Sequence, residues 1–266
     1  MASVAGPIAG TRSRLRVSGP RFRRFGLPIL GIVIAFLAWA WGYRYTRYLP
    51  APATVWEEAS QLLAQPATYE NVFVSLRRLI LGLGLGYIAA FFVTIAMRVS
   101  KWWEAFFSVY VFVTLTLPSL AVALFSLMIF GLSEMGVYFA VGLVVFPFVV
   151  VGLNDGFKTL DAGLTDMAKV YRLSWTDRVR HVAIPEMAPH MFSAFRNAHA
   201  LAWKLVVVTE VFSQQNGIGY QYKKSFDYFE LNQLMVWLFF FLIVVFGVEY
   251  GILRPLERRT TRWRRS

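Results

Sequence analysis

The sequence predicts an all-α membrane protein with six transmembrane helices and one long polar loop between the fourth and the fifth. Three observations lead to this prediction. Hydrophobic residues make up 57% of the 266 positions and charged residues only 16%, a composition typical of chains that fold in lipid. Long uncharged runs recur, and about 20 helical residues suffice to cross the hydrocarbon core of a bilayer. The 27 Lys and Arg and the 15 Asp and Glu gather mainly between these runs.

Six apolar runs qualify as spans when the chain is taken in order. Four of them carry no charged residue, and one of these four has Pro118 near its middle. Another contains only Glu249, close to its end. The remaining run is weaker because it holds Arg196, Lys204 and Glu210, which are costly in lipid. The predicted spans are residues 27–43, 79–97, 105–132, 135–153, 191–212 and 234–253.

The basic residues set the expected topology, because Lys and Arg next to spans stay on the cytoplasmic side during insertion. With both termini inside, 19 basic residues face the cytoplasm and four face the outside. This predicts a basic cytoplasmic tail at residues 1–26, a transmembrane domain at 27–253 and a second basic tail at 254–266. The net charge of +12 follows from this topology, so we expect no nucleic-acid partner and a chain surrounded by membrane lipid.

The residue inventory argues against catalysis and metal binding by this chain. It has no cysteine. Gly131 and Gly136 have the spacing of a Walker A motif, but Val137 and Tyr138 stand where Lys and Ser or Thr are required. The three histidines lie nine residues apart, which places neighbours on opposite faces of a helix. We therefore expect neither an enzyme nor a metal site.

The polar loop at about residues 154–190 is the most informative segment. An amphipathic helix is expected at its centre, because apolar residues recur there at helical spacing while charged residues fill the other face. Such a helix either lies on the membrane surface or docks into the groove of a partner protein. Pro185 and Pro189 are expected to end a rigid pair of helices directly before the fifth span. The apolar positions are Leu160, Leu164, Met167, Ala168 and Tyr171.

The loop resembles the signature of binding-protein-dependent ABC importer permeases. That signature reads EAA, three residues, Gly, nine residues, and an apolar-x-apolar-Pro ending; here Asp166 stands for the Glu and Ala168 for the second Ala. Met167 replaces the first Ala and Arg172 replaces the Gly. Because Gly permits a sharp bend, Arg172 implies either a different turn or a residue that accepts a strained φ. The ending falls on Val182, Ile184 and Pro185.

Motifs outside the loop extend the resemblance, over about residues 49–256, to the permeases of nitrate, sulfonate and taurine importers. They are Ser75-Leu76-Arg77-Arg78, Phe146-Pro147, Ala202-Trp203-Lys204 followed by Glu210, and Gly217-Ile218-Gly219.

This resemblance implies a multi-pass permease of the bacterial inner membrane with both termini in the cytoplasm. It further implies a homodimer that works by alternating access with two ATP-binding cassette ATPase subunits and a periplasmic or lipid-anchored solute-binding protein. ATP and Mg are then bound by the ATPase subunits, and this chain binds no cofactor. The residues implied to couple this chain to the ATPase are Asp161, Asp166, Met167, Ala168, Tyr171, Arg172, Leu173 and Pro185.

Small and polar residues inside the spans mark helix contacts and a candidate translocation path. A stripe four residues apart in the second span predicts the close approach of another helix. Lys204 and Glu210 are separated by roughly 240° around a helix, so each needs another partner. In the simpler interpretation Lys204 reaches an interface and Glu210 pairs at the outer end of the span. The stripe is Gly82, Gly86, Ala90 and Thr94; the path candidates are Pro118, Ser119, Trp203, Lys204 and Glu210.

The predicted function is the uptake of a small solute, coupled to a separate ATPase through residues 156–185. The resemblance points to a sulfonate, taurine or nitrate anion, or to a pyrimidine-type precursor. The choice stays open because the binding protein supplies most of the selectivity in such systems. The alternative is a self-sufficient secondary transporter or channel that uses Lys204 and Glu210 as coupling groups and needs no ATP.

Overall fold

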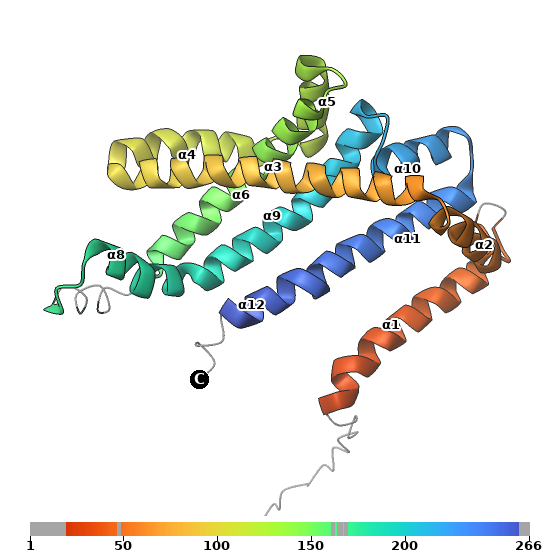
Figure 1. The fold of residues 1–266 in the computed structure, drawn as a ribbon, viewed down its shortest axis with the longest axis horizontal. Coiled ribbons are helices and arrows are strands. Elements are labelled where there is room, and N and C mark those ends of the chain that lie inside the picture. The colour runs from red at the N-terminus through yellow and green to blue at the C-terminus, as the bar shows by residue number, and fades with distance from the viewer. Residues whose placement is uncertain (1–19, 47–48, 161–162, 164–166, 168–169, 261–266) are drawn as a thin grey trace, which may run out of the picture. The chain divides into compact units, whose positions relative to one another are not determined.

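A computed structural model describes residues 20–46, 49–160, 163, 167 and 170–260, and every regular element assigned among these residues is a helix (Figure 1). The chain divides into two compact units, one ending at Pro52 and the other beginning at Ala53. The all-α class is confirmed. In the first unit, α1 (Pro20–Gly42) is followed by a turn. Trp39, near the end of α1, donates a hydrogen bond from Nε1 to the carbonyl of Pro50, at 3.1 Å.

The second unit is built around three long helices, α3 (Pro66–Val99), α6 (Glu134–Lys158) and α9 (Ile184–Ser213). α6 is the central one, because it contacts both α3 and α9. In its most apolar stretch 61% of the residues are buried, against 33% for α3 and 22% for the helix Leu231–Glu257, which begins with α11 (Leu231–Val248). Its run of valines supplies much of the core: Val137, Val141, Val145 and Val149 have no exposed surface.

The small-residue stripe of α3 lies against α6, as predicted. A Cβ built on Gly82 would lie 2.6 Å from Val141 Cβ, and one on Gly86 would lie 2.9 Å from the carbonyl oxygen of Gly142. Ala90 and Thr94 continue the stripe and are buried as well. Only glycine therefore allows the two backbones to approach this closely.

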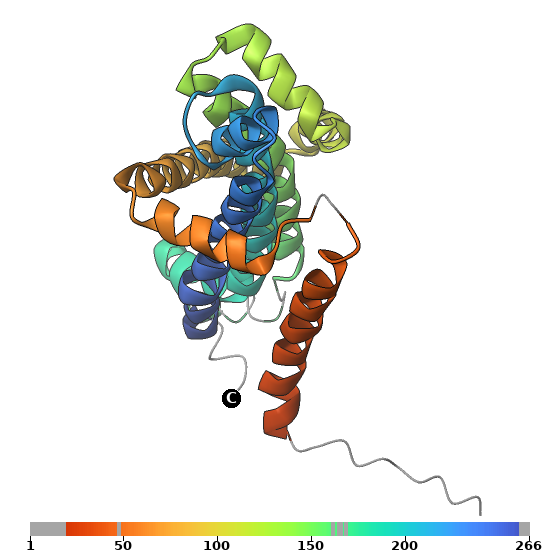
Figure 2. The ribbon, with the colours of Figure 1, turned by 90° about the vertical axis from the view of Figure 1, so that its right-hand side faces the viewer.

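The predicted span at 105–132 is two helices rather than one. α4 (Lys101–Thr116) and α5 (Ser119–Phe130) meet at a bend of 99°, visible in Figures 1 and 2. Pro118 has no N–H to continue the helical hydrogen bonds and serves as the N-cap of α5. Ser100 separates α3 from α4 and accepts a hydrogen bond from the Trp103 amide, at 3.3 Å, so the chain reverses direction there.

Among the described residues, three helices are long and apolar enough to cross a membrane. They are α3, α6, and the continuous helix Leu231–Glu257 formed by α11, η2 (Glu249–Leu253) and most of α12 (Arg254–Thr260). The bent α4–α5 pair can act as a fourth span, and Leu30–Gly42 is a shorter apolar helix. α9 is not in this set, because its charged residues lower its hydropathy. It packs against several other helices, among them α3, α5, α6 and α10 (Ile218–Asp227).

Candidate functional site

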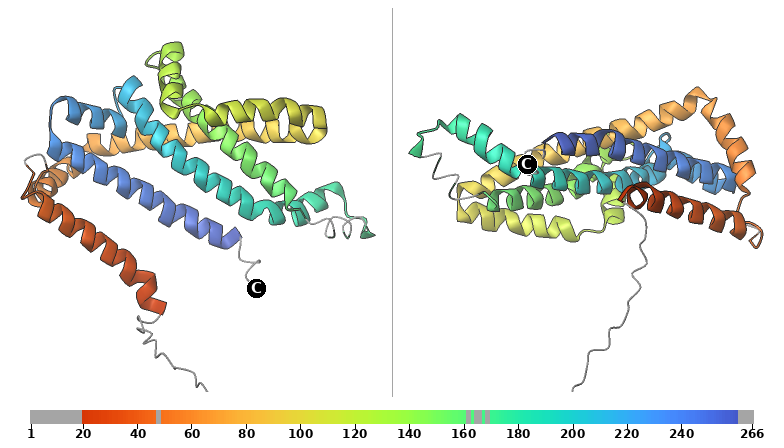
Figure 3. Two further views of the ribbon diagram at one scale, coloured as in Figure 1. Left: turned by 180° about the vertical axis from the view of Figure 1, so that it is seen from behind. Right: turned by 90° about the horizontal axis from the view of Figure 1, so that it is seen from below.

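The loop between α6 and α9 lies at one end of the bundle, and α10 lies at the opposite end (Figures 1 and 3). Two sets of side-chain hydrogen bonds shape the part of the loop that precedes α9. Ser174 Oγ accepts a hydrogen bond from the Asp177 amide, at 3.1 Å, and donates one to the Asp177 carboxylate, at 2.6 Å. This pair caps the short helix α8 (Trp175–Arg178). Arg178 Nε donates to the carbonyl of Leu173, at 2.9 Å, which fixes the approach to the helix.

Arg172 adopts the left-handed conformation, with φ at +52°. The sequence left open whether Arg172, at the position of the expected Gly, forms a different turn or accepts a strained φ. The structure shows the strained φ. A side chain in this region costs roughly 1–2 kcal/mol relative to the right-handed conformation. The bend is thus retained although the residue that normally permits it is absent.

Apolar side chains around this bend face outward. Met167 is 55% exposed, Val170 80% and Tyr171 71%. Leu173 is half-buried, and Asp161, Asp166 and Ala168 lie outside the described residues. We call Met167, Val170 and Tyr171 the loop ridge. Clustered apolar groups that are left exposed mark an interaction surface.

The loop continues into α9 without a break. α8 is followed directly by the π-helix η1 (Val179–Ala183) and then by α9. The prediction that Pro185 and Pro189 end the loop helices is wrong. Pro185 occupies the first turn of α9, where its missing N–H costs nothing, and Pro189 lies inside the helix. The loop is therefore continuous with a helix of 30 residues, about 45 Å long at 1.5 Å per residue.

A buried ionic cluster lies at the other end of α9. Arg78 of α3 and Glu210 of α9 have no exposed side-chain surface, and Arg78 Nη1 lies 2.8 Å from Glu210 Oε1. The same guanidinium donates two hydrogen bonds to the carboxylate of Glu134 of α6, from Nε at 3.0 Å and from Nη2 at 2.7 Å. Ser75 donates to Glu210 at 2.7 Å. These four residues, the Arg78 cluster, connect α3 to the start of α6 and to the end of α9.

The Arg78 cluster also holds the segment that leads into α10. The Gly219 amide donates to Glu210 Oε2 at 2.8 Å, and the Ile218 amide donates to Ser75 Oγ at 2.9 Å. Gly217 has φ at +104° and its amide donates to Asn71 Oδ1 at 2.7 Å. A side chain at Gly217 or Gly219 would collide with Glu210 or with the backbone of α9. The two glycines are therefore needed for this close approach.

The structure separates the path candidates rather than gathering them. Glu210 is in the Arg78 cluster, as the simpler interpretation predicted, while Lys204 is exposed and makes no ion pair with any described residue. Trp203 is buried in the core and donates from Nε1 to His199 Nε2 at 3.0 Å. Pro118 and Ser119 are exposed at the α4–α5 bend. Their role in a path stays a prediction.

Sequence reasoning missed the Arg78 cluster, although the predicted span 79–97 begins directly after Arg77 and Arg78. The available signal was the position of two carboxylates, Glu134 at the start of one span and Glu210 near the end of another. Arg77 adds a second cation, 3.3 Å from Glu134. Which cation meets which carboxylate depends on how the helices pack, and the order of spans does not contain that information.

Comparisons with known proteins agree with this architecture. The family model described as binding-protein-dependent transport system inner membrane component matches residues 82–261. The putative aliphatic sulfonates transport permease of Bacillus subtilis is 25% identical over 271 residues, covering 100% of this chain and 98% of that protein. The nitrate import permease of Synechococcus elongatus is 26% identical over 150 residues, covering 56% and 54%.

A solved structure shares the fold. The crystal structure of an amino acid ABC transporter with histidines superposes with a TM-score of 0.61 at 18% identity, covering 75% of this chain and 97% of that one.

Proposed function

The chain belongs to the family of binding-protein-dependent transport system inner membrane components, the permeases of ABC importers, and from this premise we propose how it works. It forms a homodimer in the bacterial inner membrane and receives its solute from a separate binding protein. Two ATPase subunits dock on the loop between α6 and α9 and hydrolyse the ATP. The two permeases then open their shared path alternately to the two sides of the membrane.

The loop ridge is the observation that carries this proposal. Met167, Val170 and Tyr171 expose apolar surface beyond the end of α6, where a membrane-surface helix would bury it in lipid and a coupling loop would bury it in a partner. The sequence match to the permease signature covers the same residues. We assign the ridge to the ATPase interface on these two grounds.

The connection from the ridge through α9 to the Arg78 cluster supports the coupling step. α9 begins at the loop and holds Glu210 near its far end. Because Glu210 is bound to Arg78 of α3, a shift of α9 at the loop pulls on α3 and α6 at the other end. The three helices then move as one body, which is the kind of rocking that alternating access requires.

The substrate class follows from the relatives. Those named as permeases for aliphatic sulfonates and for nitrate suggest a small anion for this chain. Selection among such anions is assigned to the binding protein, and the Arg78 cluster is not assigned to the solute, since its charged groups already pair with one another.

The alternative of a self-sufficient transporter requires Glu210 to exchange a coupling ion. Both of its oxygens already accept hydrogen bonds, from Arg78, Ser75 and the Gly219 amide. Release of any of these leaves a buried group unpaired. The ABC importer is therefore the better-supported function.

The test is the Tyr171→Glu variant, co-expressed with an ATP-binding cassette subunit and reconstituted with a binding protein. A charge on the ridge should abolish complex formation and solute-stimulated ATP hydrolysis. Tyr228→Glu is the matched control, because Tyr228 is 68% exposed and lies at the end of α10, far from the loop; it should retain the complex with the ATPase. Equal behaviour of the two variants would refute the assigned interface. Uptake driven by an ion gradient without ATP would refute the importer itself.

A further inference from the structure

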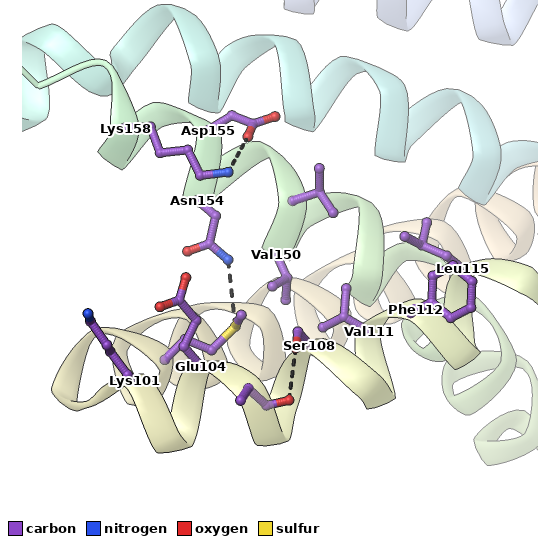
Figure 4. A pocket seen from close by; sticks show the side chains of 13 residues that line it. Lys101, Glu104, Ser108, Val111, Phe112, Leu115, Val150, Asn154, Asp155 and Lys158 are labelled. Atoms are coloured by element: carbon purple, nitrogen blue, oxygen red, sulfur yellow. Dashed lines mark hydrogen bonds and ion pairs between the residues drawn. The ribbon is translucent and has the colours of Figure 1, made fainter.

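A groove of about 480 Å³ opens between α4 and the last turns of α6 (Figure 4). This size lies within the usual range of small-molecule sites, about 300–1,000 Å³. Met97 of α3 contributes to its lining and accepts a weak hydrogen bond from the Asn154 side chain, with Nδ2 at 3.6 Å from Sδ. The groove is separate from both the loop ridge and the Arg78 cluster.

The lining changes from charged to apolar along the length of the groove. Lys101 and Glu104 of α4 lie beside Asp155 and Lys158 of α6 at one end, and the other end is apolar (Figure 4). The charged residues gather at one end because α4 and α6 run in opposite directions. The start of α4 therefore lies next to the end of α6. The apolar end is lined by Val111, Phe112 and Leu115.

The dimensions match one leaflet of a bilayer. From position 101 to position 115 a helix rises about 21 Å at 1.5 Å per residue, which covers a headgroup region and the roughly 15 Å that is half of the hydrocarbon core. The floor holds no unpaired polar group at its middle, since Ser108 Oγ donates to the Ala105 carbonyl at 2.8 Å. Val111 and Val150 close the floor, with 6% and 1% of their surface exposed. An acyl chain can lie there.

The charged end suits a zwitterion. It presents two ammonium groups and two carboxylates, and only Lys158 and Asp155 are paired, at 3.4 Å. Lys101 and Glu104 make no ion pair with any residue that the structure describes. A headgroup with only negative charge would meet two carboxylates, and a choline headgroup has no N–H to donate to them. A phosphate joined to a primary ammonium satisfies both signs of charge.

We propose that this groove binds one molecule of phosphatidylethanolamine from the cytoplasmic leaflet. Its phosphate lies near Lys101 and Lys158, its ammonium group near Glu104 and Asp155, and one acyl chain along the apolar end. The leaflet follows from the basic residues at this end of the bundle, which the topology rule places in the cytoplasm.

The first experiment measures lipid retained by the purified full-length chain, by native mass spectrometry after exposure to vesicles of phosphatidylethanolamine and phosphatidylglycerol in equal amounts. Ser108→Trp fills the middle of the groove and should reduce retained phosphatidylethanolamine at least tenfold. Val109→Trp is the matched control, because residue 109 is exposed, next in sequence and not part of the lining. It should leave retention unchanged. Equal retention by both variants overturns the proposal.

The second experiment tests the headgroup. The wild-type chain should retain phosphatidylethanolamine over phosphatidylglycerol by at least fivefold, and the double variant Glu104→Gln with Asp155→Asn should lose or reverse this preference. No preference in the wild type overturns the proposal. Two other outcomes also overturn the proposal. If Ser108→Trp abolishes dimer formation, the groove is the contact with a second copy of the chain. If a sulfonate or nitrate displaces the lipid, the groove is a site for the solute. Neither readout involves ATP or uptake, so failure here leaves the importer function untouched.

Discussion

Arg78 makes ionic contacts with two carboxylates and lies fully buried, so the structure depends on it in a way that can be measured. Removing one partner of a buried ion pair leaves an uncompensated charge and costs about 3–5 kcal/mol. We expect Arg78→Met to lower the free energy of unfolding by about that amount, because Glu210 is then left without its cation. The measurement is thermal unfolding of the purified chain in detergent.

The double variant Arg78→Met with Glu210→Met provides the control for this prediction. It removes both charges at once, so its cost should be smaller than that of Arg78→Met alone. Arg77→Met changes an arginine that is 46% exposed and should have little effect. Additive costs for the two charge removals would show that Arg78 and Glu210 do not depend on each other.

The positive φ of Arg172 leads to the prediction that a substitution there stabilises the loop rather than destabilising it. Arg172→Gly removes the steric cost of roughly 1–2 kcal/mol but adds about 0.5–1 kcal/mol of chain entropy. A net local stabilisation of up to about 1.5 kcal/mol should appear as slower hydrogen exchange of the amides in Trp175–Arg178. Arg172→Ala removes the same guanidinium but keeps the Cβ, so it should not slow exchange. Faster exchange in Arg172→Gly would show that the arginine side chain itself stabilises the bend.

Single residues also show where sequence reasoning stops. The signature identified position 172 as a bend, because a local pattern determines a local conformation. It could not show that Glu210 is paired with Arg78, since the two are separated by 132 positions and only the packing of α3 against α9 joins them. Local requirements were therefore predictable, and the long-range pairing was not.

At the scale of elements, the glycines of α3 offer a test within one helix. Gly82 and Gly86 face α6, whereas a Cβ on Gly84 would meet no atom within 4 Å. Gly82→Ala and Gly86→Ala should each destabilise the chain by about 1–3 kcal/mol, because the added methyl group forces α3 and α6 apart. Gly84→Ala should be neutral or stabilising by up to about 1 kcal/mol. Unfolding of the three variants in detergent compares them directly, and a stable Gly86→Ala would contradict the close contact.

The helices themselves were predicted with uneven success, for physical reasons. Uncharged runs located the apolar parts of α3, α6 and α11, because a segment that crosses the hydrocarbon core needs about 20 apolar residues. Pro118 was noted within the 105–132 run, but hydropathy cannot distinguish a kink from a bend of 99°. α9 was the weakest prediction because it carries Arg196, Lys204 and Glu210, and of these only Glu210 is fully buried by the packing of other helices.

At the scale of the whole molecule, the two functional ends are joined by one element. The loop ridge and the Arg78 cluster lie toward opposite ends of α9, and the topology predicted from the basic residues places them on opposite sides of the membrane. The basic residues beside the loop, among them Arg178 and Arg180, predict that this end lies in the cytoplasm. Lys223 and Lys224 of α10 are the weaker positive group at the other end.

This orientation can be tested cleanly because the chain contains no cysteine. Thr176→Cys in α8 and Tyr228→Cys at the end of α10 each introduce the only thiol, at positions that are exposed. A membrane-impermeant maleimide should label Thr176→Cys only in inside-out vesicles and Tyr228→Cys only in right-side-out vesicles, because the strongly basic end stays in the cytoplasm during insertion. The reverse pattern would place the loop ridge outside, where no ATP is present, and would thereby remove the physical basis for coupling to an ATPase. Labelling of both variants from the same side would instead show that α9 does not cross the membrane.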